Sequence, residues 1–179
     1  MSVSPAPSAS EAQSFLATLV ANDRLTPPES VEDVRRLRFT VADPGFDGRV
    51  GQCLRALTPG QFGQPWHERL YSIADLAPYE SASAGFELLV RRCFAIDDFN
   101  GERYDGVASN YLCNLEPGAQ ARFAGPVGHP FPVPEDRGAG LLMIGMGTGI
   151  APFRGLVRRI YDDLGGWEGP VRLFFGALS

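Results

Sequence analysis

The sequence is poor in cysteine and histidine, the residues that most often hold metal clusters. Its three cysteines, Cys53, Cys93 and Cys113, lie far apart without a CxxC pair, and only two histidines are present. This pattern indicates neither a disulfide framework nor a metal site. It is typical of a protein from the reducing cytoplasm, which is the location we expect.

Long apolar runs and an excess of positive charge are also missing. No apolar stretch approaches the roughly 20 residues that a membrane-spanning helix needs. The N-terminus lacks the basic start and apolar core of a signal peptide, and we expect residues 1–13 to form a flexible tail. The 16 Lys+Arg against 21 Asp+Glu give a net charge of -5, which argues against a nucleic-acid binder.

Apolar residues are plentiful, at 44% of the chain, and over residues 14–137 they fall in short runs between Gly/Pro turns. The six runs are SFLATLV, VRRLRFTV, QCLRAL, RLYSIA, FELLVRRCF and QARFAG. This spacing predicts an antiparallel barrel or sandwich. One short helix interrupts the runs, with Ser109 as its expected N-cap and Pro117-Gly118 as its end.

The pattern changes at about residue 138, after the proline-rich segment GHPFPVPEDRG. A continuous apolar run, GLLMIG, is followed by glycines, by a helical period that stops at Gly165-Gly166, and by a second run, VRLFFGA, expected to be a buried strand. The apolar positions of the helix are Ile150, Phe153, Val157, Ile160 and Leu164. Residues 141–177 therefore predict one βαβ unit, the start of an α/β domain over residues 138–179.

Residues 68–75, ERLYSIAD, combine a cation, an aromatic ring and a hydroxyl in one predicted strand. In an extended chain Arg69, Tyr71 and Ile73 share one face, and the residues between them share the other. An ordinary half-exposed strand of an antiparallel sheet often has the same mixture. The stretch therefore needs support from other segments before it indicates a ligand.

Two segments have features of phosphate binding. Residues 106–112, GVASNYL, lead successive main-chain N–H groups into a helix, where a pyrophosphate could sit with Arg69 on its other side. Residues 145–152, GMGTGIAP, join a strand to a helix, but their GxGxG spacing is not the GxGxxG dinucleotide fingerprint. An ordinary capped helix and an ordinary glycine turn are the alternatives.

Five stretches together resemble the plant-type ferredoxin–NADP reductase family, which uses FAD and includes the reductase halves of diflavin enzymes. They are RLYS (69–72), LLVRR (88–92), GVASNYLCNLEPG (106–118), GPVG (125–128) and GTGIAPFR (147–154). The resemblance implies an FAD-binding antiparallel β-barrel with one short helix, followed by an NAD(P)-binding α/β domain. It also implies electron transfer between NADH or NADPH and a one-electron carrier of the ferredoxin or flavodoxin type.

The resemblance assigns roles to individual residues. It implies that Arg69 holds the FAD pyrophosphate, that Tyr71 stacks on the isoalloxazine, and that Ser72 hydrogen-bonds near flavin N5. Tyr71 and Ser72 are thus the expected catalytic residues. The other cofactor contacts that it implies are Leu70, Leu89, Val90, Arg91, Gly106, Val107, Ala108, Ser109 and Thr148.

The sequence departs from the family in two places. Where the family has a tyrosine that stacks on adenine, this chain reads RCFAID, with Phe94 as a possible substitute. Family members also continue well beyond FFGA with segments that read NADP, so the resemblance stops within the nucleotide-binding domain. The chain is then part of a longer polypeptide, a truncated product, or a subunit that docks on a partner through the open edge at 171–177. A non-catalytic or FAD-only subunit of a redox or photosynthetic assembly, and FMN as the flavin, remain alternatives.

Overall fold

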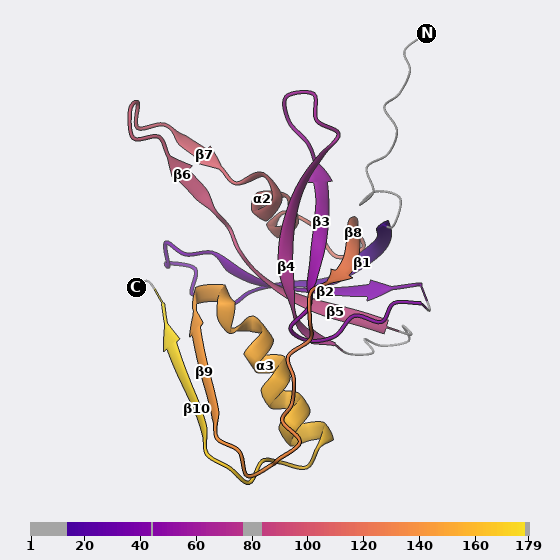
Figure 1. Ribbon diagram of the computed structural model, residues 1–179. Coiled ribbons are helices and arrows are strands. Elements are labelled where there is room, and N and C mark those ends of the chain that lie inside the picture. The colour runs from indigo at the N-terminus through magenta and orange to yellow at the C-terminus, as the bar shows by residue number, and fades with distance from the viewer. Residues whose placement is uncertain (1–13, 44, 77–83, 178–179) are drawn as a thin grey trace.

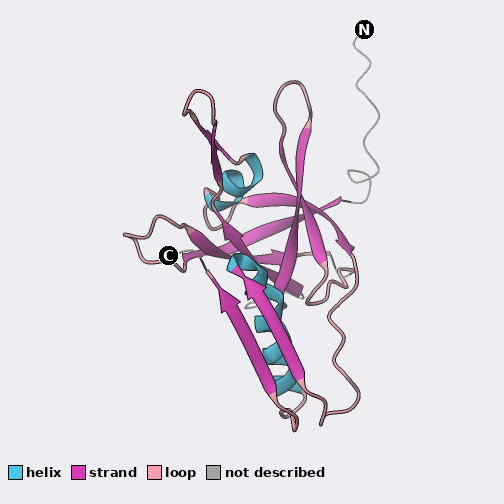
Figure 2. Cartoon of the chain, turned by 60° about the vertical axis from the view of Figure 1, so that its left-hand side comes forward, coloured by secondary structure: helices cyan, strands magenta, loops and turns pink. Residues whose placement is uncertain are grey.

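The computed structural model describes residues 14–43, 45–76 and 84–177, so the predicted flexible tail lies outside the described residues. These residues form a barrel, a projecting hairpin, a short helix and a βαβ unit (Figure 1). Figure 2 shows the same elements by type, with the helix of the βαβ unit behind its two strands. Within the described residues every helix is too short or too polar to cross a membrane.

The barrel is closed, with strand order β1-β2-β5-β4-β3-β8 and antiparallel pairing throughout. All six predicted runs form strands, and the antiparallel β-barrel implied by the resemblance is confirmed, in place of the sandwich that the spacing alone also allowed. The strands are β1 (Ser14–Arg24), β2 (Val34–Val41), β3 (Cys53–Pro59), β4 (Trp66–Leu76), β5 (Ala84–Arg91) and β8 (Gln120–Val127).

An aromatic cluster fills the barrel. Phe39, Phe86 and Phe123 are fully buried, and their ring centroids lie 5.1 to 5.2 Å apart. Such pairs contribute about 0.5–1.5 kcal/mol each beyond the area that they bury. Because the rings come from β2, β5 and β8, the cluster holds strands from different parts of the chain in fixed register.

Helix α2 (Val107–Cys113) covers one part of the barrel, where it contacts β3, β4 and β5. The prediction that Ser109 is its N-cap is wrong, because Gly106 occupies that position and no side chain caps the helix. The Ser109 hydroxyl instead accepts the Cys93 N–H at 3.0 Å, which ties the helix to the connection between β5 and β6. The helix also ends earlier than predicted, at Cys113.

A hairpin of β6 (Phe94–Ile96) and β7 (Arg103–Asp105) projects away from the barrel (Figure 1). The sequence predicted one run through residue 94, but β5 ends at Arg91 and β6 starts afresh at Phe94. All six hairpin residues are exposed, and the Arg103 guanidinium lies 4.2 Å above the Phe94 ring. One face of Phe94 is therefore already covered by a cation.

The predicted βαβ unit is confirmed, with β9 parallel to β10 and an amphipathic helix between them. The helix lies between the two-stranded sheet and the barrel (Figure 1). The elements are β9 (Leu141–Met146), the 3-10 turn η1 (Gly147–Ile150), α3 (Ala151–Arg158), the π turn η2 (Arg159–Asp163) and β10 (Val171–Gly176).

The expectation that the last strand is buried is wrong for β10. Leu173, Phe174 and Phe175 are 45%, 59% and 54% exposed. Parallel strands are normally covered on both faces. Here α3 packs on one face of the β9–β10 sheet, and none of the described residues covers the other.

Candidate cofactor site

The alternation predicted for β4 is confirmed. Arg69 and Tyr71 pair with Ala56 and Leu54 of β3, two residues of the barrel core, so they share a face with the buried Ile73. Ile73 lies deep in the barrel, Tyr71 packs against its end, and Arg69 reaches solvent. The strand thus carries a core residue, a half-buried ring and an exposed cation in succession along one face.

Arg69 keeps its charge available. Its Nη1 donates to the Glu68 carbonyl oxygen at 2.8 Å, and among the described residues it forms no ion pair with a carboxylate. The neighbouring arginines of the site differ in this respect. Arg91 pairs with Glu32 at 3.4 Å and Arg92 with Asp33 at 2.9 Å. Arg69 is therefore the cation of this region best able to bind an outside anion.

Tyr71 and Ser72 project to opposite faces of β4. Burial raises the pKa of Tyr71 well above its usual value, and the nearby Cys113 and Cys93 thiols raise it further, so the ring stays a neutral phenol. The Ser72 hydroxyl lies 3.6 Å from the Cys53 sulfur, its neighbour across the strand pair. Leu70, on the Ser72 face, is 55% exposed.

The start of α2 supplies main-chain donors beside this strand. The first N–H groups of any helix have no intrahelical acceptor, and here no side chain caps Val107, Ala108 or Ser109. The Ser109 hydroxyl accepts the Cys93 N–H and donates to the Gly106 carbonyl oxygen at 3.3 Å. Ser109 can therefore offer a ligand its main-chain N–H, but not its hydroxyl. A Cβ added at Gly106 would lie 2.8 Å from the Ser109 hydroxyl and 3.1 Å from the Cys93 carbonyl oxygen, so a side chain there would displace the Ser109 hydroxyl from its present contacts.

Arg92 fixes the orientation of α2, a role that the sequence did not suggest. Its guanidinium donates to Asp33 at 2.9 Å, to the Asn110 side-chain oxygen at 2.9 Å and to the Asn114 side-chain oxygen at 2.8 Å. At the C-terminal end of the helix, Asn22 also donates to the Cys113 carbonyl oxygen at 3.1 Å. Two side chains distant in sequence, Arg92 and Asn22, thus hold the helix against the barrel.

The side chains of the predicted β5 residues point to opposite sides of the barrel wall. Val90 is fully buried in the core, at 0% exposure for the whole residue, so it offers no surface to a ligand. Leu89 is partly buried on the other face, and Arg91 is exposed and paired with Glu32. Thr148 lies in the turn η1, which contacts β5. The structure thus brings β4, β5 and α2 together and places the glycine turn beside β5.

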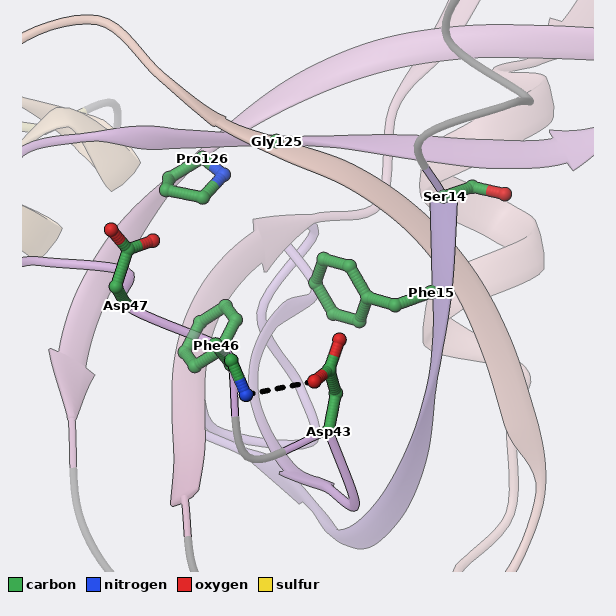
Figure 3. Close-up of a pocket in the computed structure, with 8 residues that line it drawn as sticks. Ser14, Phe15, Asp43, Phe46, Asp47, Gly125 and Pro126 are labelled. Carbon is green, nitrogen blue, oxygen red and sulfur yellow. Dashed lines mark hydrogen bonds between the residues drawn. The ribbon is translucent and has the colours of Figure 1, made fainter.

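A separate pocket of about 290 Å³ lies where β1 begins (Figure 3). The rings of Phe15 and Phe46, whose centroids are 5.5 Å apart, and the carboxylates of Asp43 and Asp47 line it. None of the predicted cofactor residues is among its lining residues. The predicted contacts instead lie on β4, β5 and α2, where Arg69, Leu70 and Arg91 are exposed but Val90, Ala108 and Ser109 are buried. Among the described residues, no three His, Cys, Asp or Glu side chains are grouped so as to hold a metal.

Comparison with known proteins agrees with this arrangement. The family model described as "Oxidoreductase FAD-binding domain" matches residues 25–131. The chain is 33% identical over 158 residues to a cyanelle ferredoxin–NADP reductase of Cyanophora paradoxa, with 85% of this chain and 42% of the relative covered. It is 34% identical over 168 residues to the ferredoxin–NADP reductase of Spirulina sp, with 90% of this chain and 57% of the relative covered. The chain thus spans about half the length of these relatives.

A solved structure has the same fold. Ferredoxin-NADP+ reductase from Plasmodium falciparum superimposes with a TM-score of 0.71 at 18% identity, covering 94% of this chain and 60% of that one. At this identity the likeness concerns the fold alone. It extends across both the barrel and the βαβ unit, since nearly the whole chain is covered.

Proposed function

Because the chain belongs to the family of oxidoreductase FAD-binding domains, we propose that its barrel binds FAD across β4, β5 and α2. Arg69 and the main-chain N–H groups of Val107, Ala108 and Ser109 hold the pyrophosphate from two sides, whereas the Gly106 N–H already donates to the Cys93 carbonyl oxygen at 2.8 Å. The observation that carries this proposal is the exposed guanidinium of Arg69, which has no carboxylate partner among the described residues and lies on a strand that α2 contacts. A buried diphosphate needs such compensation.

The remaining residues orient the flavin. Tyr71 presents a neutral ring for stacking, and its partial burial limits its rotation. Ser72 supplies a hydroxyl near the reacting nitrogen, and Leu70 and Leu89 add apolar contact. Arg91 and Thr148 complete the set. When bound, FAD supplies the redox chemistry, while the protein supplies binding, orientation and exclusion of water.

For the whole protein we propose electron transfer between NAD(P)H and a one-electron carrier such as ferredoxin. The names of the relatives support this, and one structure of the Plasmodium enzyme contains 2'P-AMP. We further propose that the FAD-binding domain covers residues 14–137 and that residues 138–179 begin the nucleotide-binding domain. The choice between NADH and NADPH depends on segments beyond the matched half of the relatives.

Replacing Arg69 with alanine tests the proposal. Loss of a charge-assisted hydrogen bond costs about 1.5–3 kcal/mol, which corresponds to roughly 10- to 150-fold weaker FAD binding. Titration of the apoprotein by isothermal calorimetry, with the flavin absorbance as a second readout, measures this. Arg159→Ala is the matched control, since it removes the same charge from an exposed position on the helix surface. A change of less than twofold in Arg69→Ala contradicts the assignment.

A second candidate is an FAD-only subunit that docks on a larger redox or photosynthetic assembly. The exposed apolar face of the β9–β10 sheet favours it, since Leu142, Ile144 and Met146 are 64%, 66% and 80% exposed. Reduction of an artificial acceptor by the purified monomeric chain with NADPH would exclude this candidate. Mass analysis of the released flavin distinguishes FAD from FMN.

A cytoplasmic location stays a prediction, since the relatives include a cyanelle protein and a chloroplastic protein.

A further inference from the structure

Two carboxylates lie side by side on the outer wall of the barrel. The register of β4 against β5 shifts between Ile73 and Asp75, so Ala74 forms a bulge. The bulge changes the direction of Asp75, which would otherwise share the core face with Ile73 and instead pairs with Glu87 outside. Asp75 is 6% exposed and Glu87 3%. Two buried like charges in direct opposition are destabilising unless cations accompany them.

Helix α3 supplies these cations. Arg154 Nη1 contacts the Glu87 carboxylate and lies 3.4 Å from Asp75 Oδ2, and Arg158 Nη1 contacts the same Asp75 oxygen. The two arginines are one helical turn apart and therefore share a face. The Asp75 charge is the main reason that the pKa of Arg158 is raised. The four side chains, named here the α3 ion cluster, connect the βαβ unit to two barrel strands.

The helix also rests directly on the strand between the two arginines. A Cβ added at Gly155 would lie 2.3 Å from the Ala74 carbonyl oxygen and 2.9 Å from a Val50 methyl group. No side chain larger than hydrogen fits there. The bulge at Ala74 thus serves both contacts, because it turns Asp75 outward and presents its own carbonyl to the helix.

The α3 ion cluster lies close in sequence to both halves of the proposed site. Asp75 follows Ser72 by three residues on β4, and Arg154 follows Thr148 by six residues through η1 and the first turn of α3. A strand and a helix transmit position with little bending over such short distances. The cluster therefore fixes where the glycine turn lies relative to the strand that carries Arg69, Tyr71 and Ser72.

We infer that Arg154 and Arg158, through Asp75 and Glu87, are positioning residues that hold the glycine turn at residues 147–150 against the barrel. They set the place of Thr148 beside a flavin bound on β4. This inference rests on the proposed function for the flavin contact, but the attachment of the turn to the barrel does not depend on it. None of the four side chains is required to touch the cofactor.

Hydrogen–deuterium exchange of the full chain tests the attachment. In the double variant Asp75→Asn with Glu87→Gln, which keeps side-chain volume and leaves no buried carboxylate, we expect at least tenfold faster exchange over residues 147–158. Amides of the barrel core, such as Leu37 and Phe39, keep their wild-type rates. Arg158→Lys retains most of the protection because it keeps the charge, and Arg159→Gln matches wild type. Unchanged exchange over residues 147–158, or equal acceleration throughout the barrel, overturns the inference.

Amide NMR spectra recorded with and without FAD test the positioning. In the wild type, FAD shifts the signals of both Ser72 and Thr148. In the double variant the Ser72 shift is expected to persist while the Thr148 shift is lost, and persistence of both shifts overturns the positioning role. If the wild type binds no FAD, the proposed function fails, and the exchange experiment alone decides whether the cluster attaches the turn.

Discussion

Replacing Gly155 with alanine sets two physical effects of opposite sign against each other. Alanine is a better helix former than glycine by about 1 kcal/mol, so propensity alone predicts a more stable protein. Gly155, however, lies in α3 where an added Cβ would be 2.3 Å from the Ala74 carbonyl oxygen. Because a comfortable contact is about 3.5 Å, the helix must retreat by roughly 1 Å or the strand must deform.

The packing effect is expected to be the larger. Overpacking of a tight contact costs about 1–3 kcal/mol, which leaves a net destabilisation of about 1 kcal/mol once the gain in propensity of about 1 kcal/mol is subtracted. For a chain of this size that corresponds to a melting temperature lower by roughly 2–4 °C. Retreat of the helix would also lengthen the contacts of Arg154 and Arg158 with the barrel.

Thermal and urea unfolding monitored by circular dichroism measure this effect. Gly149→Ala is the matched control, since no atom lies within 4 Å of a Cβ placed there and its backbone does not require glycine. Its stability is expected to stay within about 0.5 kcal/mol of wild type. A Gly155→Ala protein that is more stable than wild type would refute the claim that α3 rests on the β4 backbone.

Two further predictions concern titratable groups. Burial raises the pKa of Asp33, but hydrogen bonds from Arg92 and Arg35 outweigh the effect of burial, so the net pKa is lowered from 3.8. The ionised Asp33 carboxylate therefore stabilises the fold above pH 3.8, and this stabilisation is lost as the pH falls below 3.8. Asp33→Asn should therefore be less stable at pH 7 and lose less stability on acidification, and identical urea-unfolding profiles from pH 7 to pH 2 would contradict this. Burial raises the pKa of the Cys113 thiol to about 11. At pH 8 an aromatic disulfide reagent should label Cys53 and Cys93 in the folded protein and Cys113 only after unfolding. Equal labelling of all three cysteines in the folded state would contradict the burial of Cys113.

The barrel and the βαβ unit could be predicted because each depends on local patterns. Alternating apolar residues mark the strands, and a helical period marks α3. The failures have non-local causes. Ser109 was expected to cap its own helix, but Cys93, 16 residues earlier, engages its hydroxyl. The break between β5 and β6 contains neither glycine nor proline, so no turn signal reveals it.

The candidate site also combines features that local sequence patterns predict with features that depend on distant contacts. The faces of Arg69 and Tyr71 follow from strand alternation, and the main-chain N–H donors of residues 107–109 follow from the start of a helix. The role of Arg92 depends on a contact with Asp33, 59 residues away, which no local pattern encodes. The outward direction of Asp75 depends on a bulge that only the pairing of β4 with β5 reveals.

The triple contact of Arg92 has a practical consequence for anyone who alters this protein. Asp33, Arg92 and Asn110 come from three separate segments, and the Arg92 guanidinium binds both of the other two side chains. A library that randomises the loop before β2, including Asp33, is therefore expected to disturb the position of α2, which is close in space but distant in sequence. These three positions are best varied as a set.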